Sequence, residues 1–241
     1  EILKKYGIEP TLKEIRKPMG RAKREHIEKM LKMRRIRRLW RQIYGKKPGE
    51  SDIDKLYSEF EKNLLKILPD HCKLIPGVLK AVAQLRKKNI KIGSTTGYTK
   101  EMIDVISPIA KNYGYYPDYI VTSSDVSQGR PMPFMCYLNT VNLKVFPFES
   151  VIKVGDTVED IKEGLNSGMW SVGVIKGSSI LGLSEKELKM MKEKELKKRI
   201  KKARKKFKKA GAHYVIESLN ELDSVIDDVE SKLKKGKTPS I

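Results

Sequence analysis

Short apolar runs alternate with helix-like patterns from about residue 74 to the end of the chain. The runs IKIGSTTG, YIVTS, VIKVGD, WSVGVI and HYVIES have the length and composition of buried strands. The segments between them carry helix signals, such as Pro76 and Gly77 ahead of VLKAVAQLRKKN and the Asn-Ser-Gly stop at residues 166–168. Strands that alternate with helices in this way predict an α/β fold with a parallel sheet.

Residues 1–68 carry helical patterns only. Thr11 with Glu14 matches a capping box, as Ser218 with Glu221 does ahead of the last helix. The segments REHIEKMLKMRRIRRLWRQIYG and SDIDKLYSEFEKNLLKIL have helical apolar spacing. We therefore predict a small helical domain, residues 1–68, followed by an α/β domain, residues 69–241, with the junction near Pro69.

The composition narrows the compartment and the class of ligand. The 241 residues include 51 Lys or Arg and 30 Asp or Glu, and the net charge of +21 favours anionic ligands without choosing among small anions, nucleic acid and lipid. Cys72 and Cys136 have no paired spacing, which argues against a disulfide framework and for a reducing compartment. No apolar run approaches the ~20 residues that span a bilayer, so we expect a cytoplasmic protein without a membrane partner.

The segment 184–209 is strongly basic, with fourteen Lys or Arg and four Glu. A nucleic-acid arm is one interpretation. However, Leu196, Ile200, Ala203 and Phe207 follow helical spacing, so one face of a helix here can pack on the core while lysines cover the rest. A single aromatic residue provides no stacking platform for bases. We therefore expect a solvated amphipathic helix rather than a nucleic-acid partner.

Polar residues follow three successive strand runs, where open parallel sheets bind their ligands. Ser94, Thr95, Thr96 and Gly97 follow the first run, and we expect their hydroxyl and N–H groups to open a helix and hold a phosphate oxygen. Arg130, in GRPMP, follows the second run and offers a fork of donors to an oxyanion.

Asp156 and Asp160 follow the third run on one turn, and two carboxylates suit a hard cation such as Mg²⁺. Each of the three groups also has an ordinary structural interpretation: a helix cap at the first strand end, a solvated loop charge at Arg130, and N-capping by Asp156 or Thr157. Their joint occurrence at three strand ends predicts a phosphoryl-transfer site.

The order Thr96, Arg130 and GDTVED resembles the haloacid dehalogenase superfamily. The longer segments RKPMG, KIGSTTGYTKEM, GRPMPFMCY, IKVGDTVEDIKEG and GMWSVGVIKGSS are similar to its phosphonoacetaldehyde hydrolase family, over nearly the whole chain. The resemblance implies a Rossmann-like core with a helical cap, a homodimer formed through the cap, a Mg²⁺ cofactor, and hydrolysis of phosphonoacetaldehyde to acetaldehyde and phosphate. It assigns substrate or phosphate binding to Met19, Thr96, Gly97, Tyr98 and Arg130, and metal binding to Asp156 and Asp160, the latter as an outer-sphere residue.

The resemblance also implies a cap lysine that forms a Schiff base with the aldehyde, after a PMG segment. Lys23 in KPMGRAKREH stands at the matching place, and an iminium would let carbon accept the electron pair of the breaking bond. Lys23, Ile27 and Met30 have helical spacing, so we expect the amine at the end of an apolar stripe with a lowered pKa. His26, one turn further, is expected to relay a proton. The alternatives are a solvated lysine and an exposed helix histidine.

One catalytic group implied by the resemblance has no match here. It is a nucleophilic Asp in a D-x-x-G-T turn that ends the first, central core strand, upstream of the cap. Asp52 and Asp54 begin a cap helix, and Asp227 and Asp228 lie in the last helix. We expect this strand and its Asp upstream of residue 1, and residues 1–241 alone to be inactive. The alternatives are a truncated, catalytically dead relative, a strand supplied by another chain, or a generic haloacid dehalogenase-type phosphatase that uses no imine.

Overall fold

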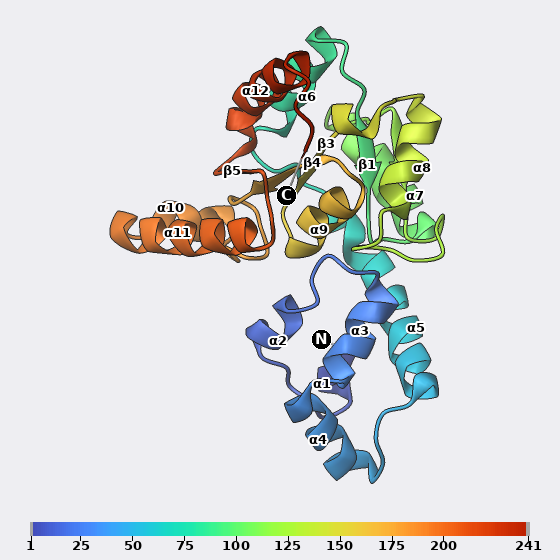
Figure 1. Cartoon of the computed structure of the whole chain (residues 1–241). Helices are drawn as coiled ribbons and strands as arrows, with labels where there is room; N and C mark the ends of the chain where they lie inside the picture. Colours follow the sequence, from blue (N-terminus) through green and yellow to red (C-terminus); the bar gives the residue numbers. More distant parts are fainter. Residues whose placement is uncertain (1, 240–241) are drawn as a thin grey trace.

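The computed structural model describes residues 2–239, so residue 1 of the predicted helical domain and residues 240–241 of the predicted α/β domain lie outside the described residues. The helices of the first 67 residues gather in one half of the molecule, and the sheets with their covering helices form the other half (Figure 1). We call these two parts the cap and the core; the boundary between residues 68 and 69 stays a prediction.

The cap has an apolar cluster of its own. Its helices are α1 (Ile2–Lys5), α2 (Leu12–Arg16), α3 (Lys23–Leu31), α4 (Arg34–Tyr44) and α5 (Glu50–Ile67). Leu31, Ile36 and Trp40 are buried in this cluster, and Thr11 and Glu14 form the predicted capping box ahead of α2. The predicted helical stretch over residues 24–45 is two helices, α3 and α4. Met33, between them, has an extended backbone and packs on the apolar cluster, so both helices face that cluster.

The described part of the core contains five short parallel strands, one within each predicted run. β1 (Gly93–Thr95) pairs with β2 (Tyr119–Val121), and β3 (Ile152–Gly155), β4 (Trp170–Val174) and β5 (Tyr214–Ile216) form a second sheet in the order β3-β4-β5. The register places Thr95 beside Val121 and Gly155 beside Gly173. The predicted α/β fold class is confirmed.

The core helices alternate with the strands along the chain. They are α6 (Val78–Lys87), α7 (Lys100–Asn112), α8 (Phe134–Leu143), α9 (Val158–Asn166), α10 (Glu185–Met190), α11 (Glu193–Lys209) and α12 (Leu222–Lys234), with short 3-10 turns at Leu68–His71, Phe148–Ser150 and Leu219–Glu221. Helix α6 precedes β1, α12 follows β5, and the others lie between strands. Among residues 2–239 no helix combines the length and the apolar character that crossing a bilayer requires.

The two faces of β4 pack against different helices. Trp170, Val172 and Val174 face α6 and α12 in one cluster, whereas α9 and α11 cover the other face. Gly173 allows α11 to approach closely, because a Cβ there would lie 2.7 Å from ring atoms of Phe207. The β-carbon that every other residue carries would therefore push α11 off the sheet.

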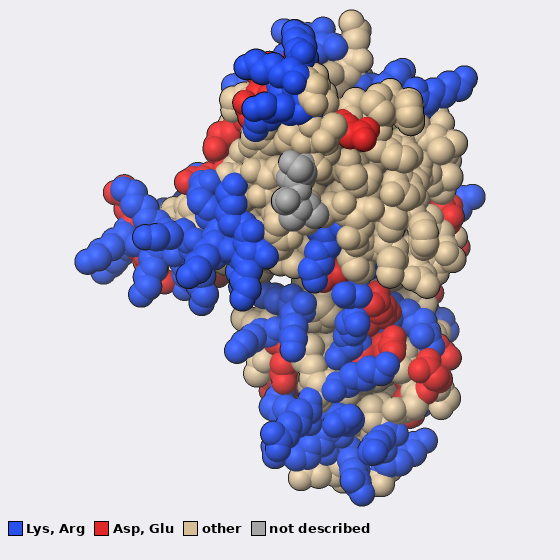
Figure 2. Space-filling view, in the orientation of Figure 1, with Lys and Arg blue, Asp and Glu red and all other residues tan. Residues whose placement is uncertain are grey.

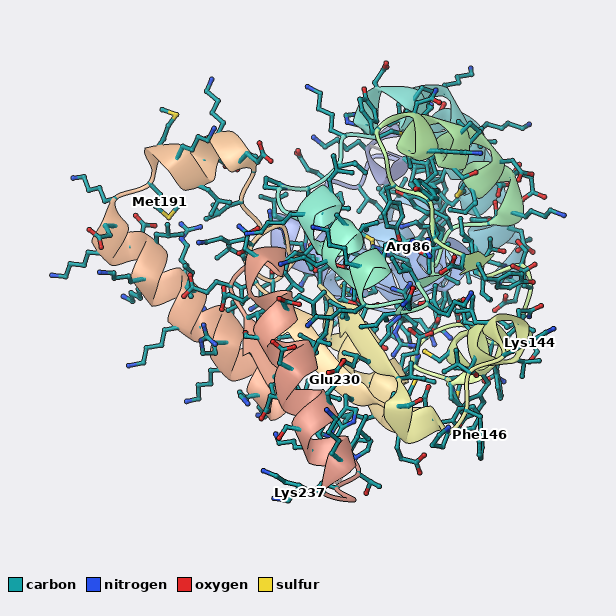
Figure 3. The ribbon with its side chains drawn as sticks, turned by 90° about the horizontal axis from the view of Figure 1, so that it is seen from above. Arg86, Lys144, Phe146, Met191, Glu230 and Lys237 are labelled. Carbon is teal, nitrogen blue, oxygen red and sulfur yellow. The ribbon has the colours of Figure 1, made fainter. Side chains whose placement is uncertain are left out.

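The basic segment 184–209 forms two helices, α10 and α11, that project from one side of the core (Figures 1 and 3). Ile200, Ala203 and Phe207 are buried against the core and Leu196 is partly buried, as their spacing predicts. Lysine side chains cover the remaining surface, and Figure 2 shows them gathered over these helices. α11 is thus an amphipathic helix with one face packed on the core. This packing gives no support to the nucleic-acid interpretation.

Replacing Phe207 with alanine should destabilise the core. The ring is fully buried against Gly173, so the cavity left behind should cost about 3–5 kcal/mol and lower the melting temperature by roughly 6–20 °C. Circular dichroism melting of Phe207→Ala measures this loss. Lys202→Ala, an exposed change on the same helix, is the control and should melt within about 2 °C of the parent; equal melting temperatures for both variants would contradict the packing of α11.

Candidate active site

One cavity of about 1080 Å³ lies where the loops after β1, β2 and β3 meet the cap. Eight of the nine predicted site residues line it: Met19, Lys23, Thr96, Gly97, Tyr98, Arg130, Asp156 and Asp160. The ninth, His26, lies one turn along α3 from Lys23. Residues separated by more than 130 positions in sequence therefore share one cleft, as expected for a ligand site at the carboxyl ends of parallel strands.

The turn after β1 differs from its prediction. Residues 94–97 do not open a helix: α7 begins at Lys100 and Thr99 is its N-cap residue. The Thr96 amide donates to the Val121 carbonyl over 3.0 Å, and the Tyr98 amide donates to the Thr96 hydroxyl over 3.1 Å. The predicted helix start at residues 94–97 is wrong, because the backbone pairing with β2 continues up to Thr96; phosphate binding by this turn stays a prediction.

Arg130 is buried, so the interpretation as a solvated loop charge is wrong. Its Nη1 lies 2.9 Å from Oδ1 of Asp160, and its Nη2 donates to the Thr95 carbonyl over 2.9 Å. Its Nε lies 3.3 Å from Oε2 of Glu163. The guanidinium is thus held by two carboxylates and one strand end while Arg130 still lines the cavity, so only the N–H groups that these partners leave are available to a ligand.

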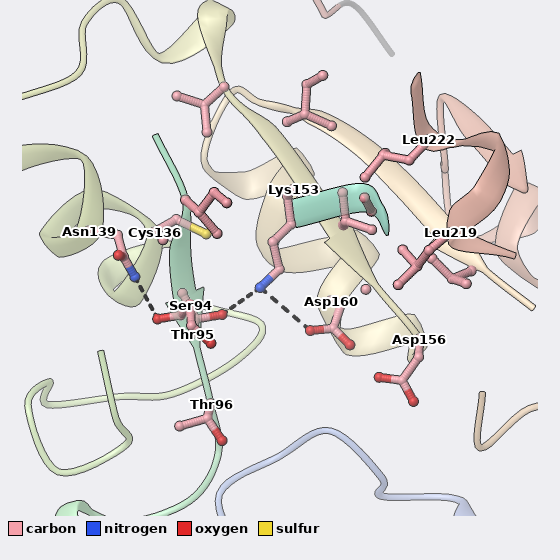
Figure 4. Close-up of a pocket in the computed structure, with 18 of the residues that line it drawn as sticks. Ser94, Thr95, Thr96, Cys136, Asn139, Lys153, Asp156, Asp160, Leu219 and Leu222 are labelled. Carbon is pink, nitrogen blue, oxygen red and sulfur yellow. Dashed lines mark hydrogen bonds and ion pairs between the residues drawn. The ribbon is translucent and has the colours of Figure 1, made fainter. Parts of the chain in front are cut away.

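Two charged residues that the sequence analysis missed complete this cluster. Glu163 on α9 is fully buried, and its Oε2 lies 2.6 Å from Nζ of Lys153 on β3. Lys153 also lies 3.5 Å from Oδ1 of Asp160 and donates to the Thr95 hydroxyl over 2.5 Å (Figure 4). A lysine within the apolar run VIKVGD and a glutamate three residues after Asp160 were the available signals, because buried charges occur in pairs.

Asp160 is the third residue of α9 and completes a capping box at the start of this helix. Its Oδ2 accepts from the Thr157 amide over 3.1 Å and from the Thr157 hydroxyl over 2.5 Å. The Asp160 amide donates to the Thr157 hydroxyl over 3.1 Å, so the N-cap interpretation holds for Thr157. Burial alone would raise the pKa of Asp160, but Arg130 and Lys153 hold it below its ordinary value. Both oxygens of this carboxylate already have protein partners.

Asp156 has a different environment. It is exposed to the cavity, and among the described residues no ion pair joins it to a lysine or arginine. Partial enclosure by protein, followed by repulsion from Asp160, raises its pKa. The carboxylates Asp156, Asp160 and Glu163 exceed the cations Arg130 and Lys153 by one negative charge, so a cation beside Asp156 would be stabilised here.

Lys23 is the first residue of α3 and lies over the ring of Tyr98, with Nζ 4.7 Å from the ring centroid. Burial, with a smaller contribution from Arg130, lowers its pKa and so increases the fraction of neutral amine. Ile27 and Met30 are buried in the cap, which leaves Lys23 at the core-facing end of the predicted apolar stripe. The amine lines the cavity instead of pointing into bulk solvent.

His26 is half-buried, so it is not the exposed helix histidine of the alternative interpretation. Burial and then the charge of Lys23 lower its pKa to about 4, against a hydrogen bond with the Ile15 backbone that opposes the shift. The imidazole is therefore neutral at pH 7. A neutral imidazole one helical turn from an amine is able to accept a proton.

Comparison with known proteins agrees with the fold and the motifs. A family model described as haloacid dehalogenase-like hydrolase matches residues 1–174. A phosphonoacetaldehyde hydrolase of Bacillus cytotoxicus is 49% identical over 232 residues, which cover 96% of this chain and 88% of that protein. A bifunctional phosphonoacetaldehyde hydrolase/aminoethylphosphonate transaminase of Clostridioides difficile is 50% identical over 98% of this chain, which spans 37% of that longer protein.

Solved structures show the same relationship. The crystal structure of a phosphonoacetaldehyde hydrolase-like protein from Oleispira antarctica superposes with a TM-score of 0.96 at 38% identity, over 99% of this chain and 86% of that one. A β-phosphoglucomutase from Clostridium difficile, at 17% identity and a TM-score of 0.65, shares the fold alone. The resemblance to phosphonoacetaldehyde hydrolases is confirmed, and the chain belongs to the haloacid dehalogenase-like hydrolase family.

Proposed function

We propose that the full-length protein hydrolyses the carbon–phosphorus bond of phosphonoacetaldehyde, giving acetaldehyde and phosphate. The observation that carries the proposal is the position of Lys23, whose pKa is lowered and whose amine lines the same cavity as Thr96 and Asp156. An amine and a site for a phosphoryl group in one cleft suit a substrate with an aldehyde at one end and a phosphonate at the other.

In the proposed reaction the neutral amine of Lys23 attacks the aldehyde, and loss of water gives an iminium. When the carbon–phosphorus bond breaks, its electron pair moves onto carbon and forms an enamine. His26 is the proposed proton carrier for water loss and for protonation of the enamine, because its imidazole is neutral. Hydrolysis of the resulting iminium releases acetaldehyde and restores Lys23.

The phosphoryl group needs an acceptor, which we propose is an Asp at the end of a strand inserted between β1 and β3. In the described part of the chain no backbone pairing joins β1 to β3, and the cavity extends along both strands between α6, α8 and α12. The cavity walls there are largely apolar, as a buried strand requires. Water would then hydrolyse the aspartyl phosphate to free phosphate.

We also propose a Mg²⁺ ion beside Asp156, although residues 2–239 contain no group of three or more His, Cys, Asp or Glu side chains placed to hold a metal ion. Asp156 would be the direct ligand from this chain, since its carboxylate faces the cavity, and Asp160 would orient the site because its own oxygens are occupied. The ion would neutralise charge on the phosphoryl oxygens. Thr96, Gly97 and Arg130 are the proposed phosphate-side residues, with Met19 and Tyr98 beside the aldehyde.

A generic phosphatase of the same family is the second candidate, because Asp156, Asp160 and Arg130 would serve it equally. A catalytically dead relative is the third. We also propose a homodimer formed through the cap and a reducing, cytoplasmic location, which the two free cysteines support.

The full-length protein should release equal amounts of acetaldehyde and phosphate from phosphonoacetaldehyde. Coupled reduction of acetaldehyde and a dye assay for phosphate measure the two products. Chelation should stop the reaction and Mg²⁺ should restore it; Asp156→Asn should lower the rate by roughly 10³-fold, because a catalytic metal supplies several kcal/mol. Residues 1–241 alone should give no turnover. Hydrolysis of simple phosphate esters, with none of phosphonoacetaldehyde, would favour the generic phosphatase.

Borohydride added with substrate should trap a covalent adduct at Lys23, detectable by peptide mass spectrometry. Lys23→Arg keeps the charge but forms no imine, so acetaldehyde release should fall to background and the adduct should vanish. Lys29→Arg, on an exposed face of the same helix, is the matched control and should behave as the parent. Full activity of Lys23→Arg would remove the imine mechanism.

The pH dependence of Lys23 reactivity should report its lowered pKa. The neutral amine reacts with acylating reagents, so labelling of Lys23 should rise with pH through a midpoint below that of an ordinary lysine. Mass spectrometry of pulse-acetylated protein gives this midpoint without any need for turnover. In urea-unfolded protein the midpoint should return to the ordinary value; an ordinary midpoint in the folded protein would argue against a desolvated amine.

A further inference from the structure

The loop between α2 and α3, residues 17–22, contacts the core immediately before Lys23. In Figure 1 this loop runs along the core-facing side of the cap, below α9. A Cβ on Gly20 would lie 2.5 Å from Oγ1 of Thr157, and a Cβ on Gly97 would lie 2.8 Å from the Arg21 carbonyl oxygen. The loop backbone therefore lies directly on the two turns that carry Thr96 and Asp156.

An ion pair crosses this contact. Nη2 of Arg21 lies 3.0 Å from Oε2 of Glu159, and Nη1 of Arg21 lies 2.5 Å from Oε1 of Glu25 on α3. The side chains of Arg21 and Glu159 are 18% and 11% exposed, so water screens their attraction only in part. One guanidinium thus connects the first turn of the helix that carries Lys23 to the first turn of α9.

We propose that Arg21 and Glu159 form a cap latch that positions Lys23 for imine formation; this rests on the proposed function. Glu159 stands between Asp156 and Asp160 in GDTVED, yet it belongs neither to the buried charge cluster nor to the predicted metal site. Lys23 follows Arg21 by two residues, a span of at most about 7 Å along the chain. Any movement of Arg21 away from α9 therefore carries the amine away from the phosphate side of the cavity.

The contacts distinguish the latch from a general cap–core attraction. Neither glycine contact provides a directional bond, so backbone packing alone would allow the loop to slide over the two turns. The Arg21 guanidinium opposes such sliding, because it lies between carboxylates on opposite sides of the contact and is attracted to both. Glu159 and Arg21 are positioning residues, since in the proposed reaction neither touches the substrate.

A merely structural role is the rival explanation. An acidic residue in the first turn stabilises a helix, so Glu159 could act on α9 alone. That role predicts that a Glu159 variant has a lower melting temperature, with unchanged hydrogen exchange in the cap loop. The latch predicts faster hydrogen exchange at residues 19–23, on the other side of the contact.

The test compares Glu159→Gln, Arg21→Gln, the double variant and Lys162→Gln by hydrogen exchange. Lys162 is the matched control, because this exposed residue lies 3.9 Å from the same Glu159 and is not part of the contact with the cap. Exchange of the residue 19–23 amides should be about three- to tenfold faster in both single variants and unchanged in Lys162→Gln. The double variant should resemble either single one, because each change removes the same interaction.

Borohydride trapping at Lys23 in the full-length protein gives the second readout, with the trapping rate reduced by the same factor in Glu159→Gln. Unchanged exchange in both single variants, or fully additive effects in the double variant, would overturn the latch. Faster exchange with no trapping even in the parent protein would support the latch and overturn the imine mechanism, so the two proposals fail separately. Arg21→Gln probes the contact from the cap side and guards against a folding defect of α9.

Discussion

The pairing of buried charges across the gap between β1 and β3 is the constraint on which the site depends. Arg130 and Lys153 would be costly to bury alone, and Asp160 and Glu163 supply the counter-charges. Because Thr95 on β1 bonds to both Arg130 and Lys153, the cluster joins two sheets that share no backbone ladder in the described part of the chain. The same bonds align the strand ends, so the geometry of the cleft follows from charge neutralisation.

The cap supplies one side of the cleft and places Lys23 there. Its own apolar cluster fixes α3, and close backbone contact at Gly20 and Gly97 brings the first residue of α3 to the cleft. Desolvation at this junction changes the chemistry of Lys23, which would be an unremarkable cation on an open surface. The reactivity of one side chain is thus a property of the contact between two parts of the molecule.

Local patterns were sufficient for most of the fold. Five apolar runs gave five strands, and the capping boxes at Thr11 and Ser218 lie where their sequences placed them, because these features depend on neighbours within four residues. The break at Met33 was missed because it depends on packing against the cap cluster, which is not local. Motif positions located the cleft, but they could not show that Arg130 turns inward: that follows from Glu163 and Lys153, whose pairing exists only in three dimensions.

The low pKa of His26 makes the stability of the folded cap depend on pH. An unfolded histidine binds a proton below pH 6.5, whereas the folded imidazole resists protonation until about pH 4. Between these values the unfolded chain holds the extra proton, so the free energy of unfolding falls as the medium becomes more acidic. Acid therefore destabilises the folded cap through His26, the ring one helical turn along α3 from Lys23.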